Sequence, residues 1–397
     1  MMKTVSQRIV GMNGDEAVAF AAKQAEVDVV AAYPITPQTI IVERFSDYVA
    51  NGEVDTQFVC VESEHSALSA CVGSSLVGSR VFTASSSQGL ALMHEVLYLA
   101  SGMRTPIVMA VVNRALSAPI NIHNDHSDMM GSRDCGWIQL YAENAQEAYD
   151  WTLQAFRIAE DHKVSLPVTV NLDGFTISHA MEGVTVLEDD QVRKFVGERS
   201  PIYKVDTTKP VTFGALVLPD YYSEFKRQQV EAMNSASSVI VEVADEYEKT
   251  SGRQYSAVSA YHAEDAEAVV VCLGSIAGTS RSVATKLQQQ GKRVGVIKVW
   301  QYRPFPTIEI ARLLSKVKSV GVIDRAVSFG APYGALCSDI ASTKVLTGLQ
   351  TKVFNAVCGL GGRDVKPTDI EAVFETALRQ SRGEPVVDPV SFIGVRP

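Results

Sequence analysis

The stretch DVVAAYPITPQTIIVERFSDYVA, residues 28–50, contains the repeating unit of the fold. Its apolar start, DVVAAYP, predicts a buried strand, and QTIIVERFSDYVA predicts a helix. Between them, Pro34 and Pro37 fix their own φ angles and keep the preceding residues, Tyr33 and Thr36, out of helical geometry. Thr36 is therefore expected in a stiff turn at the carboxyl end of a strand. Two interpretations stay open: the hydroxyl contacts a ligand, or the turn satisfies it locally.

The alternation of strand and helix continues through the first half of the chain. Further apolar runs predict strands at residues 56–62, 80–86, 105–114, 136–142 and 164–174. Helical patterns lie between most of them, at residues 63–78, 88–102 and 144–162. Short apolar runs that alternate with helices predict an α/β fold with a parallel sheet and helices on both faces.

A break in this rhythm begins at about residue 175. The segment up to 262 contains acidic LEDDQ, proline-flanked SPIYKVDTTKP and a long polar helix, so we interpret it as a connecting excursion. The alternation then resumes. The length of 397 residues favours two domains, which we predict as residues 1–262, including the excursion, and residues 263–397.

Composition and charge exclude several classes of protein. With 46% hydrophobic and 20% charged residues and a net charge of −9, the chain is predicted to be globular and to bind no nucleic acid. It shows neither a signal-peptide pattern nor an apolar run long enough to span a bilayer, so we expect a cytoplasmic protein without membrane contact. None of the six cysteines forms a C-x-x-C pair, so we predict no metal site. The stretch HNDHSD could ligate a metal, but a polar loop is favoured.

Motifs for nucleotides and for serine hydrolysis are absent from the sequence: there is no P-loop, no G-x-G-x-x-G after the first strand and no G-x-S-x-G. What remains are polar residues at strand ends. These are Thr36, then Glu62 or Glu64 in VESEHSA, and Arg114 after an apolar strand. A glutamate there could bind a ligand nitrogen or only stabilise a helix N-terminus. Arg114 could bind a carboxylate or pair with an acid of the fold.

Five motifs together identify a family. YPITPQT, VESEHSA, FTASSSQGLALM, VNRALSAPINIHNDHSD and CGWIQLYAENAQEAYD resemble the α subunit of the 2-oxoacid:ferredoxin oxidoreductases, most of all its pyruvate branch. GSIAGTSRSVATKLQQQGKRVGVIKVWQYRPFP resembles the transketolase C-terminal-like domain of the same family. The resemblance implies a pyrimidine-binding domain for thiamine diphosphate, followed by that second domain.

The resemblance also implies roles for individual residues. Glu64 matches the glutamate that hydrogen-bonds the pyrimidine ring, although Glu62 stays an alternative. Thr36 and Arg114 match the contacts to the substrate carboxylate. Further cofactor contacts are expected from Pro34, Ile35, Ser87 and Gln88, and weaker expectations for a substrate loop fall on Asn113, His123 and Asp125.

Parts of the implied enzyme must lie on other chains, because this sequence has no G-D-G and no cluster-type cysteine spacing. A β subunit is expected to hold the diphosphate, Mg²⁺ and [4Fe-4S] clusters, beside γ and δ subunits and ferredoxin. The implied reaction converts pyruvate and coenzyme A to acetyl-CoA and CO2, with electrons passing to ferredoxin, or runs in reverse. Alternatives are a branched-chain 2-oxoacid, 2-oxoglutarate or oxalate as substrate, or a non-catalytic docking subunit.

Overall fold

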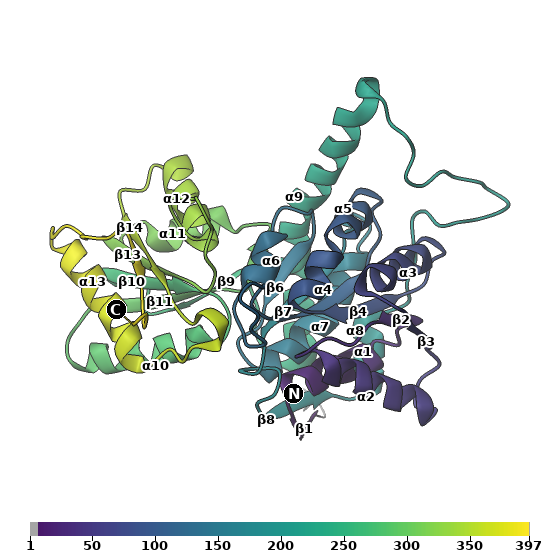
Figure 1. Cartoon of the computed structure of the whole chain (residues 1–397), viewed down its shortest axis with the longest axis horizontal. Coiled ribbons are helices and arrows are strands. Elements are labelled where there is room, and N and C mark those ends of the chain that lie inside the picture. Colours follow the sequence, from purple (N-terminus) through teal and green to yellow (C-terminus); the bar gives the residue numbers. More distant parts are fainter. Residues whose placement is uncertain (1–6, 397) are drawn as a thin grey trace.

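Two mixed, mainly parallel sheets organise the structure, a computed structural model that describes residues 7–396. Figure 1 shows them as two lobes. The seven-stranded sheet has the order β12 (Gln301–Arg303), β6 (Ile138–Tyr141), β7 (Val168–Asp173), β5 (Val108–Asn113), β4 (Val81–Ser85), β2 (Val29–Ala32) and β3 (Gln57–Cys60). The six-stranded sheet has the order β15 (Val390–Phe392), β14 (Lys352–Val357), β13 (Ser319–Asp324), β10 (Ala268–Cys272), β11 (Val294–Val299) and β9 (Val258–Tyr261).

Helices cover both faces of each sheet, because the central strands carry apolar side chains on both faces and both faces must be buried. On the first sheet they are α1 (Gly14–Gln24), α2 (Thr39–Ala50), α3 (Glu64–Leu76), α4 (Ser87–Leu92), α5 (His94–Gly102), α6 (Ser127–Gly131), α7 (Ala145–Glu160), α8 (Asp189–Val196) and α9 (Pro219–Ser251). On the second they are α10 (Ile276–Gln289), α11 (Thr307–Leu314), α12 (Ala335–Thr347) and α13 (Pro367–Ser381), with a short 3-10 turn at Leu360–Gly362. The predicted α/β fold is confirmed.

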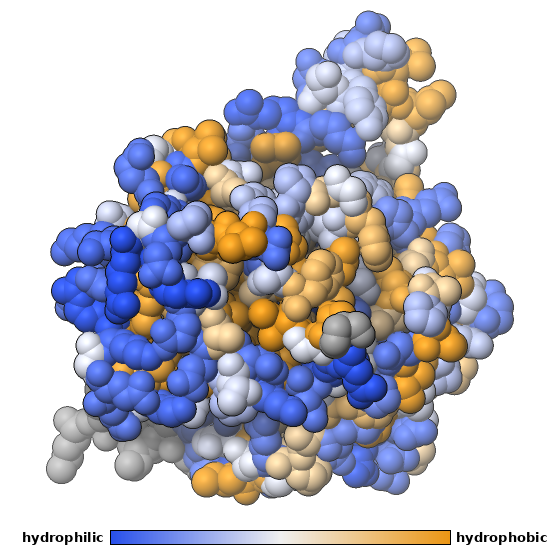
Figure 2. Space-filling view, turned by 60° about the vertical axis from the view of Figure 1, so that its left-hand side comes forward, coloured by the Kyte–Doolittle hydropathy of each residue, from blue (hydrophilic) through white to orange (hydrophobic). Residues whose placement is uncertain are grey.

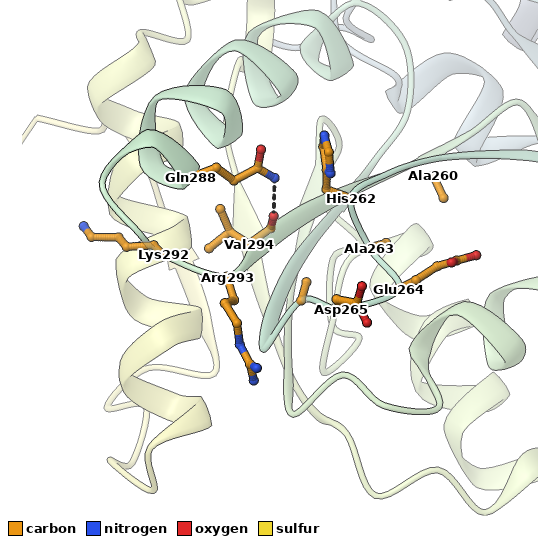
Figure 3. A pocket seen from close by; sticks show the side chains of 10 residues that line it. Ala260, His262, Ala263, Glu264, Asp265, Gln288, Lys292, Arg293 and Val294 are labelled. Carbon is orange, nitrogen blue, oxygen red and sulfur yellow. Dashed lines mark hydrogen bonds between the residues drawn. The ribbon is translucent and has the colours of Figure 1, made fainter.

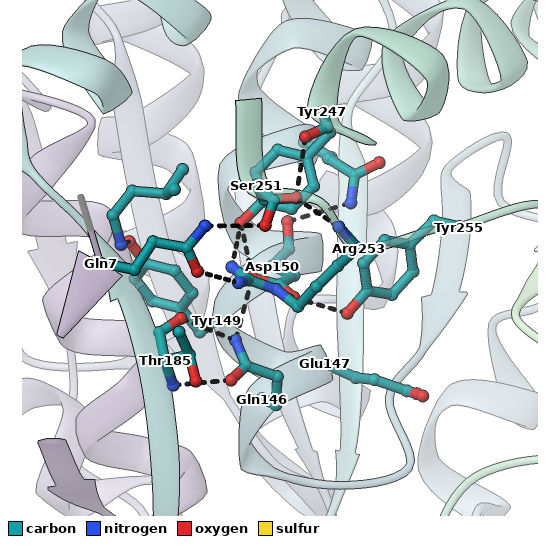
Figure 4. Close-up of polar contacts among 12 residues, drawn as sticks. Gln7, Gln146, Glu147, Tyr149, Asp150, Thr185, Tyr247, Ser251, Arg253 and Tyr255 are labelled. Atoms are coloured by element: carbon teal, nitrogen blue, oxygen red, sulfur yellow. Dashed lines mark hydrogen bonds and ion pairs between the residues drawn. The ribbon is translucent and has the colours of Figure 1, made fainter. Parts of the chain in front are cut away.

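The excursion is anchored to the first sheet's layers. Strand β8 (Glu182–Leu187) pairs antiparallel with β1 (Gln7–Met12), and the C-terminal half of α9 packs on α7. Figure 4 shows the polar junction beneath α9, where the fully buried Asp150 accepts hydrogen bonds from the side chains of Tyr247, Arg253 and Tyr255 at 2.5–2.8 Å. The Gln146 side chain adds a fifth donor at 3.2 Å, and a buried carboxylate with five donors fixes where the long helix leaves the domain.

The other half of α9 projects from the body together with the chain that leads to it (Figure 1). Figure 2 shows apolar side chains gathered on this projecting part. Its exposed apolar residues are Ile202, Tyr203, Val205, Val211, Leu216, Leu218, Tyr221, Tyr222, Phe225 and Val230.

Two elements connect the lobes in ways that the sequence did not indicate. Strand β12 lies within the predicted second domain but pairs with β6 of the first sheet. Strand β9, which ends at Tyr261, pairs with β11 of the second sheet, although it precedes residue 263. The division at residue 262 stays a prediction.

Candidate active site

The turn after β2 lies at the carboxyl edge of the first sheet, where ligands bind in open α/β sheets. The side chain of Gln38 is fully buried and donates to the carbonyl of Tyr33 at 2.8 Å, which closes the turn around Thr36. Thr36 itself is exposed, as is Pro34, while Ile35 is half-buried. The turn therefore presents the threonine at the surface of a rigid loop.

Three loops meet beside this turn because Gly174, just after β7, has no side chain. A Cβ there would lie 2.5 Å from the carbonyl oxygen of Asn113 and 2.8 Å from Cγ of Pro37. The amide of Gly174 also donates to that Asn113 oxygen at 3.1 Å. The ends of β5 and β7 and the Thr36 turn are thereby brought together, as parallel strands predict.

Arg114 follows β5 and is 7% exposed. Its guanidinium donates from Nη1 to the carbonyl of Thr36 at 2.9 Å and from Nε to the carbonyl of Asn121 at 3.1 Å. Burial lowers the pKa of Arg114, and the nearby Asp128 opposes that shift. Among residues 7–396 no carboxylate forms an ion pair with this arginine, and three of its five N–H donors have no partner. A buried cation without a counter-ion is suited to bind an anionic ligand.

Glu64 begins α3 and is 7% exposed. It lies against Gly89 of α4, where a Cβ would come within 2.6 Å of Glu64 Oε1 and 2.7 Å of Ser85 Oγ. Glu62 is exposed and accepts a hydrogen bond from the Ser66 hydroxyl at 2.7 Å. The two glutamates therefore differ sharply: one is enclosed by the strand-to-helix junction and the other faces solvent.

The serines between β4 and α4 divide into two kinds. The hydroxyls of Ser85 and Ser86 are buried and have no partner among the described residues. Ser87 is fully buried, and its hydroxyl lies 2.6 Å from both the Ala115 carbonyl and Oε1 of Gln88. Ser87 has φ +46°, a left-handed conformation that costs a non-glycine residue energy and often marks functional sites.

Asp128 is a residue of this site that sequence reasoning missed. It is 3% exposed, and its two carboxylate oxygens accept four N–H donors: the amides of Ser87, Arg114 and Met129 and the side chain of Asn113, at 2.7–3.0 Å. Burial raises its pKa to about 6, and the hydrogen bonds oppose that rise. The only sequence signal was its place in the polar stretch HNDHSD.

The predicted substrate loop separates into buried and exposed members. Asn113 and Asp125 are buried, whereas His123 is exposed and contacts Phe175, with ring centroids 5.0 Å apart and the ring planes tilted by 39°. His123 and Asn121 line a cavity of about 630 Å³ that reaches the segment 360–369 of the second domain. The carbonyl of Asn121 accepts a hydrogen bond from Arg114, so this cavity adjoins a residue that contacts the arginine.

Figure 3 shows a second cavity, of about 500 Å³, whose lining residues all lie between 260 and 294. It is bordered by His262, Glu264, Asp265, Lys292 and Arg293, just before the amino ends of β10 and β11. That is the opposite edge from the one where parallel sheets bind ligands.

The described residues, 7–396, contain no group of three or more metal-ligating side chains. Five cysteines are buried and only Cys60 is exposed. Within the same range no helix is both long and apolar enough to cross a membrane, and the cytoplasmic location stays a prediction.

Comparison with known proteins finds a matching family model for each of the two lobes. Residues 20–245 match the family "Pyruvate flavodoxin/ferredoxin oxidoreductase, thiamine diP-bdg", and residues 266–370 match "Pyruvate:ferredoxin oxidoreductase core domain II". Pyruvate synthase subunit PorA of Thermotoga maritima is 52% identical and covers 100% of both chains. PorA of Methanocaldococcus jannaschii is 48% identical over 91% of this chain and 93% of its own.

A relative with another substrate name is ketoisovalerate oxidoreductase subunit VorA of Pyrococcus horikoshii, 42% identical over 92% of each chain. Among solved structures, 2-oxoglutarate:ferredoxin oxidoreductase from Magnetococcus marinus has the same fold, with a TM-score of 0.72 and 18% identity. The match covers 94% of this chain but 65% of that one, so the chain spans about two thirds of that structure.

Proposed function

This chain belongs to the pyruvate flavodoxin/ferredoxin oxidoreductase family, and we propose that it forms the pyrimidine-binding and substrate-binding half of a pyruvate synthase active site. It is a subunit of a thiamine-diphosphate-dependent 2-oxoacid:ferredoxin oxidoreductase. The reaction joins the acetyl group of pyruvate to coenzyme A with release of CO2 and transfer of electrons to ferredoxin, or runs in reverse.

The enclosed environment of Glu64 supports its assignment to the cofactor. Glu64 Oε1 fills the space above Gly89, and the partnerless hydroxyls of Ser85 and Ser86 border the same junction. These groups fit a polar aromatic ring that can accept and donate hydrogen bonds, so Glu64 would hold a ring nitrogen of the pyrimidine. When bound, thiamine diphosphate supplies the carbon that attacks the 2-oxo group and accepts the electron pair left by CO2.

The unpaired guanidinium of Arg114 is the single observation that carries the substrate assignment. Its free N–H donors match the planar carboxylate of a 2-oxoacid. Two carbonyl contacts fix the guanidinium plane, and the exposed Thr36 hydroxyl adds a donor from the same turn. Together they would orient the carboxylate that leaves as CO2.

The remaining functions belong to partners. The chain matches subunit PorA of the Thermotoga maritima pyruvate synthase from end to end, which supports its being one subunit of a larger complex. We therefore propose a β subunit that holds Mg²⁺, the diphosphate and [4Fe-4S] clusters, with γ and δ subunits and ferredoxin completing the electron path. Ser87 and Gln88, with Pro34 and Ile35, would border the cofactor at that interface.

The test uses the purified complex with Glu64→Gln and Arg114→Ala. Glu64→Gln should lower turnover by at least about 10²-fold without loss of assembly. Arg114→Ala should raise the KM for pyruvate and lower kcat/KM by a similar factor, because a charged hydrogen bond is lost. Glu62→Gln is the matched control and should keep nearly full activity.

Substrate identity is read from the same complexes, with pyruvate, 3-methyl-2-oxobutanoate, 2-oxoglutarate and oxalate compared by kcat/KM. Pyruvate should give the highest value. Full activity in Glu64→Gln would favour the docking-subunit alternative, and a strong effect of Glu62→Gln alone would reassign the pyrimidine contact.

A further inference from the structure

One buried carboxylate connects the two halves of the site. Oδ2 of Asp128 accepts the backbone amides of Ser87 and Arg114, at 3.0 and 2.9 Å. These residues follow different strands, β4 and β5, that pair in parallel. Asp128 lies on a third element, the short helix α6. One atom, Oδ2 of Asp128, therefore links three segments of the chain, and no other atom among the described residues links the same three by hydrogen bonds.

The first of these contacts holds a strained residue. Ser87 has φ +46° and begins α4, the helix whose Gly89 lies against Glu64. Its amide is one of the helix's first N–H groups, which have no partner within the helix itself. By accepting that amide, Asp128 stabilises the left-handed conformation and fixes the start of α4 beneath the Glu64 carboxylate.

The second contact holds the substrate arginine by its backbone and not by its side chain. Oδ2 binds the Arg114 amide, and no Asp128 oxygen lies within 4 Å of the guanidinium nitrogens among the described residues. A direct ion pair would consume the donors that a ligand needs. Asp128 thus places the arginine and leaves its guanidinium free.

We propose that Asp128 is a positioning residue that sets Arg114 and the Glu64–Gly89 contact in register with each other. The inference rests on the proposed function, because it matters only if Arg114 and Glu64 contact substrate and cofactor. Asp128 touches neither of them in this assignment and acts through the backbone of Arg114 and Ser87.

The experiment compares Asp128→Ala with Asp128→Asn in the purified complex. Alanine removes all four acceptor contacts. Asparagine keeps one oxygen for Ser87 and Arg114 but loses the Met129 contact, because its NH2 replaces Oδ1. That NH2 can donate to Oδ1 of Asn113, which is buried without a partner, if the Asn113 amide turns over. Asp128→Asn therefore keeps the proposed contacts while it removes the charge.

Asp324 provides a matched control in the second domain. It is also 3% exposed, its pKa is also raised to about 6 by burial, and it accepts the amides of Leu336 and Cys337 and the side chain of Asn355 at 2.8–3.1 Å. Asp324→Ala should cost comparable thermal stability but leave the KM for pyruvate unchanged.

The expected result is a rise of about tenfold or more in the KM for pyruvate, and a fall in kcat/KM of about 10²-fold, for Asp128→Ala. Asp128→Asn should recover most of that loss. If Asp128→Ala matches Asp324→Ala in KM and kcat, or if Asp128→Asn is as impaired as alanine, the positioning role is overturned. Arg114→Ala is measured in parallel: wild-type turnover there would refute the substrate assignment, whereas an impaired Arg114→Ala beside a normal Asp128→Ala would refute only the positioning role.

Discussion

Gly89→Ala tests the position of Glu64 without removing its carboxylate. The new Cβ would lie 2.6 Å from Glu64 Oε1, whereas ordinary contact begins at 3.4 Å, so the carboxylate must move by about 0.8 Å. Cγ of Glu64 would also lie 2.8 Å from the new Cβ, so the whole glutamate side chain must change its rotamer, while the Ser85 hydroxyl can rotate away. A displacement approaching 1 Å in a catalytic group costs up to about 10²-fold in rate, or about 2.7 kcal/mol.

The assay is pyruvate-dependent reduction of ferredoxin by the complex, together with a titration of thiamine diphosphate. We expect kcat/KM to fall by between about 10-fold and 100-fold and cofactor affinity to weaken, while the melting temperature stays close to that of the wild type. Helix propensity supports that stability, because alanine is favoured over glycine by about 1 kcal/mol inside a helix.

Gly102→Ala at the end of α5 is the matched control, since a Cβ there has no atom within 4 Å. It should keep wild-type kinetics. If Gly89→Ala keeps the kinetics of Gly102→Ala, then the enclosed position of Glu64 does not matter for turnover and the reasoning fails.

Two further predictions concern buried carboxylates: Asp173, which binds Arg325 of the second domain, and Asp324, which lies within the second domain. Burial would raise the pKa of Asp173, but Arg325 and His126 outweigh it and hold the pKa well below its usual range; the resulting stability is complete above about pH 4 and lost only in stronger acid. Arg325→Met should therefore destabilise the chain at neutral pH by about 3–5 kcal/mol and raise the midpoint of acid unfolding, while the exposed Arg312→Met should change neither. Asp324, with its pKa raised to about 6, contributes stability in acid that declines as the pH rises from about 4 to about 6. Asp324→Asn should make the free energy of unfolding vary less with pH over that interval. Denaturant titrations at several pH values measure this, and an unchanged pH dependence would contradict the assignment.

Local patterns were enough to predict most elements of the first sheet. The strand at residues 105–114 and the helix at residues 144–162 correspond to β5 and α7, because a buried parallel strand and an amphipathic helix each leave a clear hydrophobic period. The helix predicted over residues 88–102 is instead two helices, α4 and α5, which divide at Met93. The sequence does not signal this division, because position 93 is a methionine and not a glycine or proline.

Helices α1, α6, α8 and α12 were not predicted, and α1 and α12 illustrate two different reasons. Helix α1 carried a usable signal: Asn13 and Glu16 exchange the hydrogen bonds of a capping box, a pattern visible as N-G-D-E before an apolar run. Helix α12 carried none. Its first amides are capped by Asp324, which belongs to β13, so the cap follows from the fold and not from neighbouring residues.

The site residues also divide into those that local sequence patterns could predict and those that depend on distant parts of the chain. Parallel strands place their carboxyl ends at one edge, which is why Thr36 and Arg114 could be expected to approach each other. The contact is now seen as a hydrogen bond from Arg114 to the Thr36 carbonyl. Asp128 could not be found this way, because it reaches the edge from the short helix α6 and binds donors from separate segments.

The second domain acts on the first through the loop that leads from Arg114 to Asp128. Arg325 donates from Nη1 to Asp173 at 2.6 Å, and its carbonyl accepts the amide of His126 at 2.8 Å. His126 Nε2 lies 2.7 Å from the same carboxylate of Asp173, so the loop is held from both domains at one point.

The other end of the loop is held in the same way. Asn121, whose carbonyl binds the Arg114 guanidinium, donates from its side chain to the carbonyl of Gly361 at 3.0 Å. Gly362 donates to the carbonyl of Asn124 at 2.6 Å. A Cβ at either glycine would come within 2.4 Å of the loop's side chains, so the two surfaces cannot slide past each other without breaking these contacts. The orientation of Arg114 therefore depends on a domain that contributes no side chain to the proposed substrate contacts, which is a physical reason for the two domains to remain in one chain.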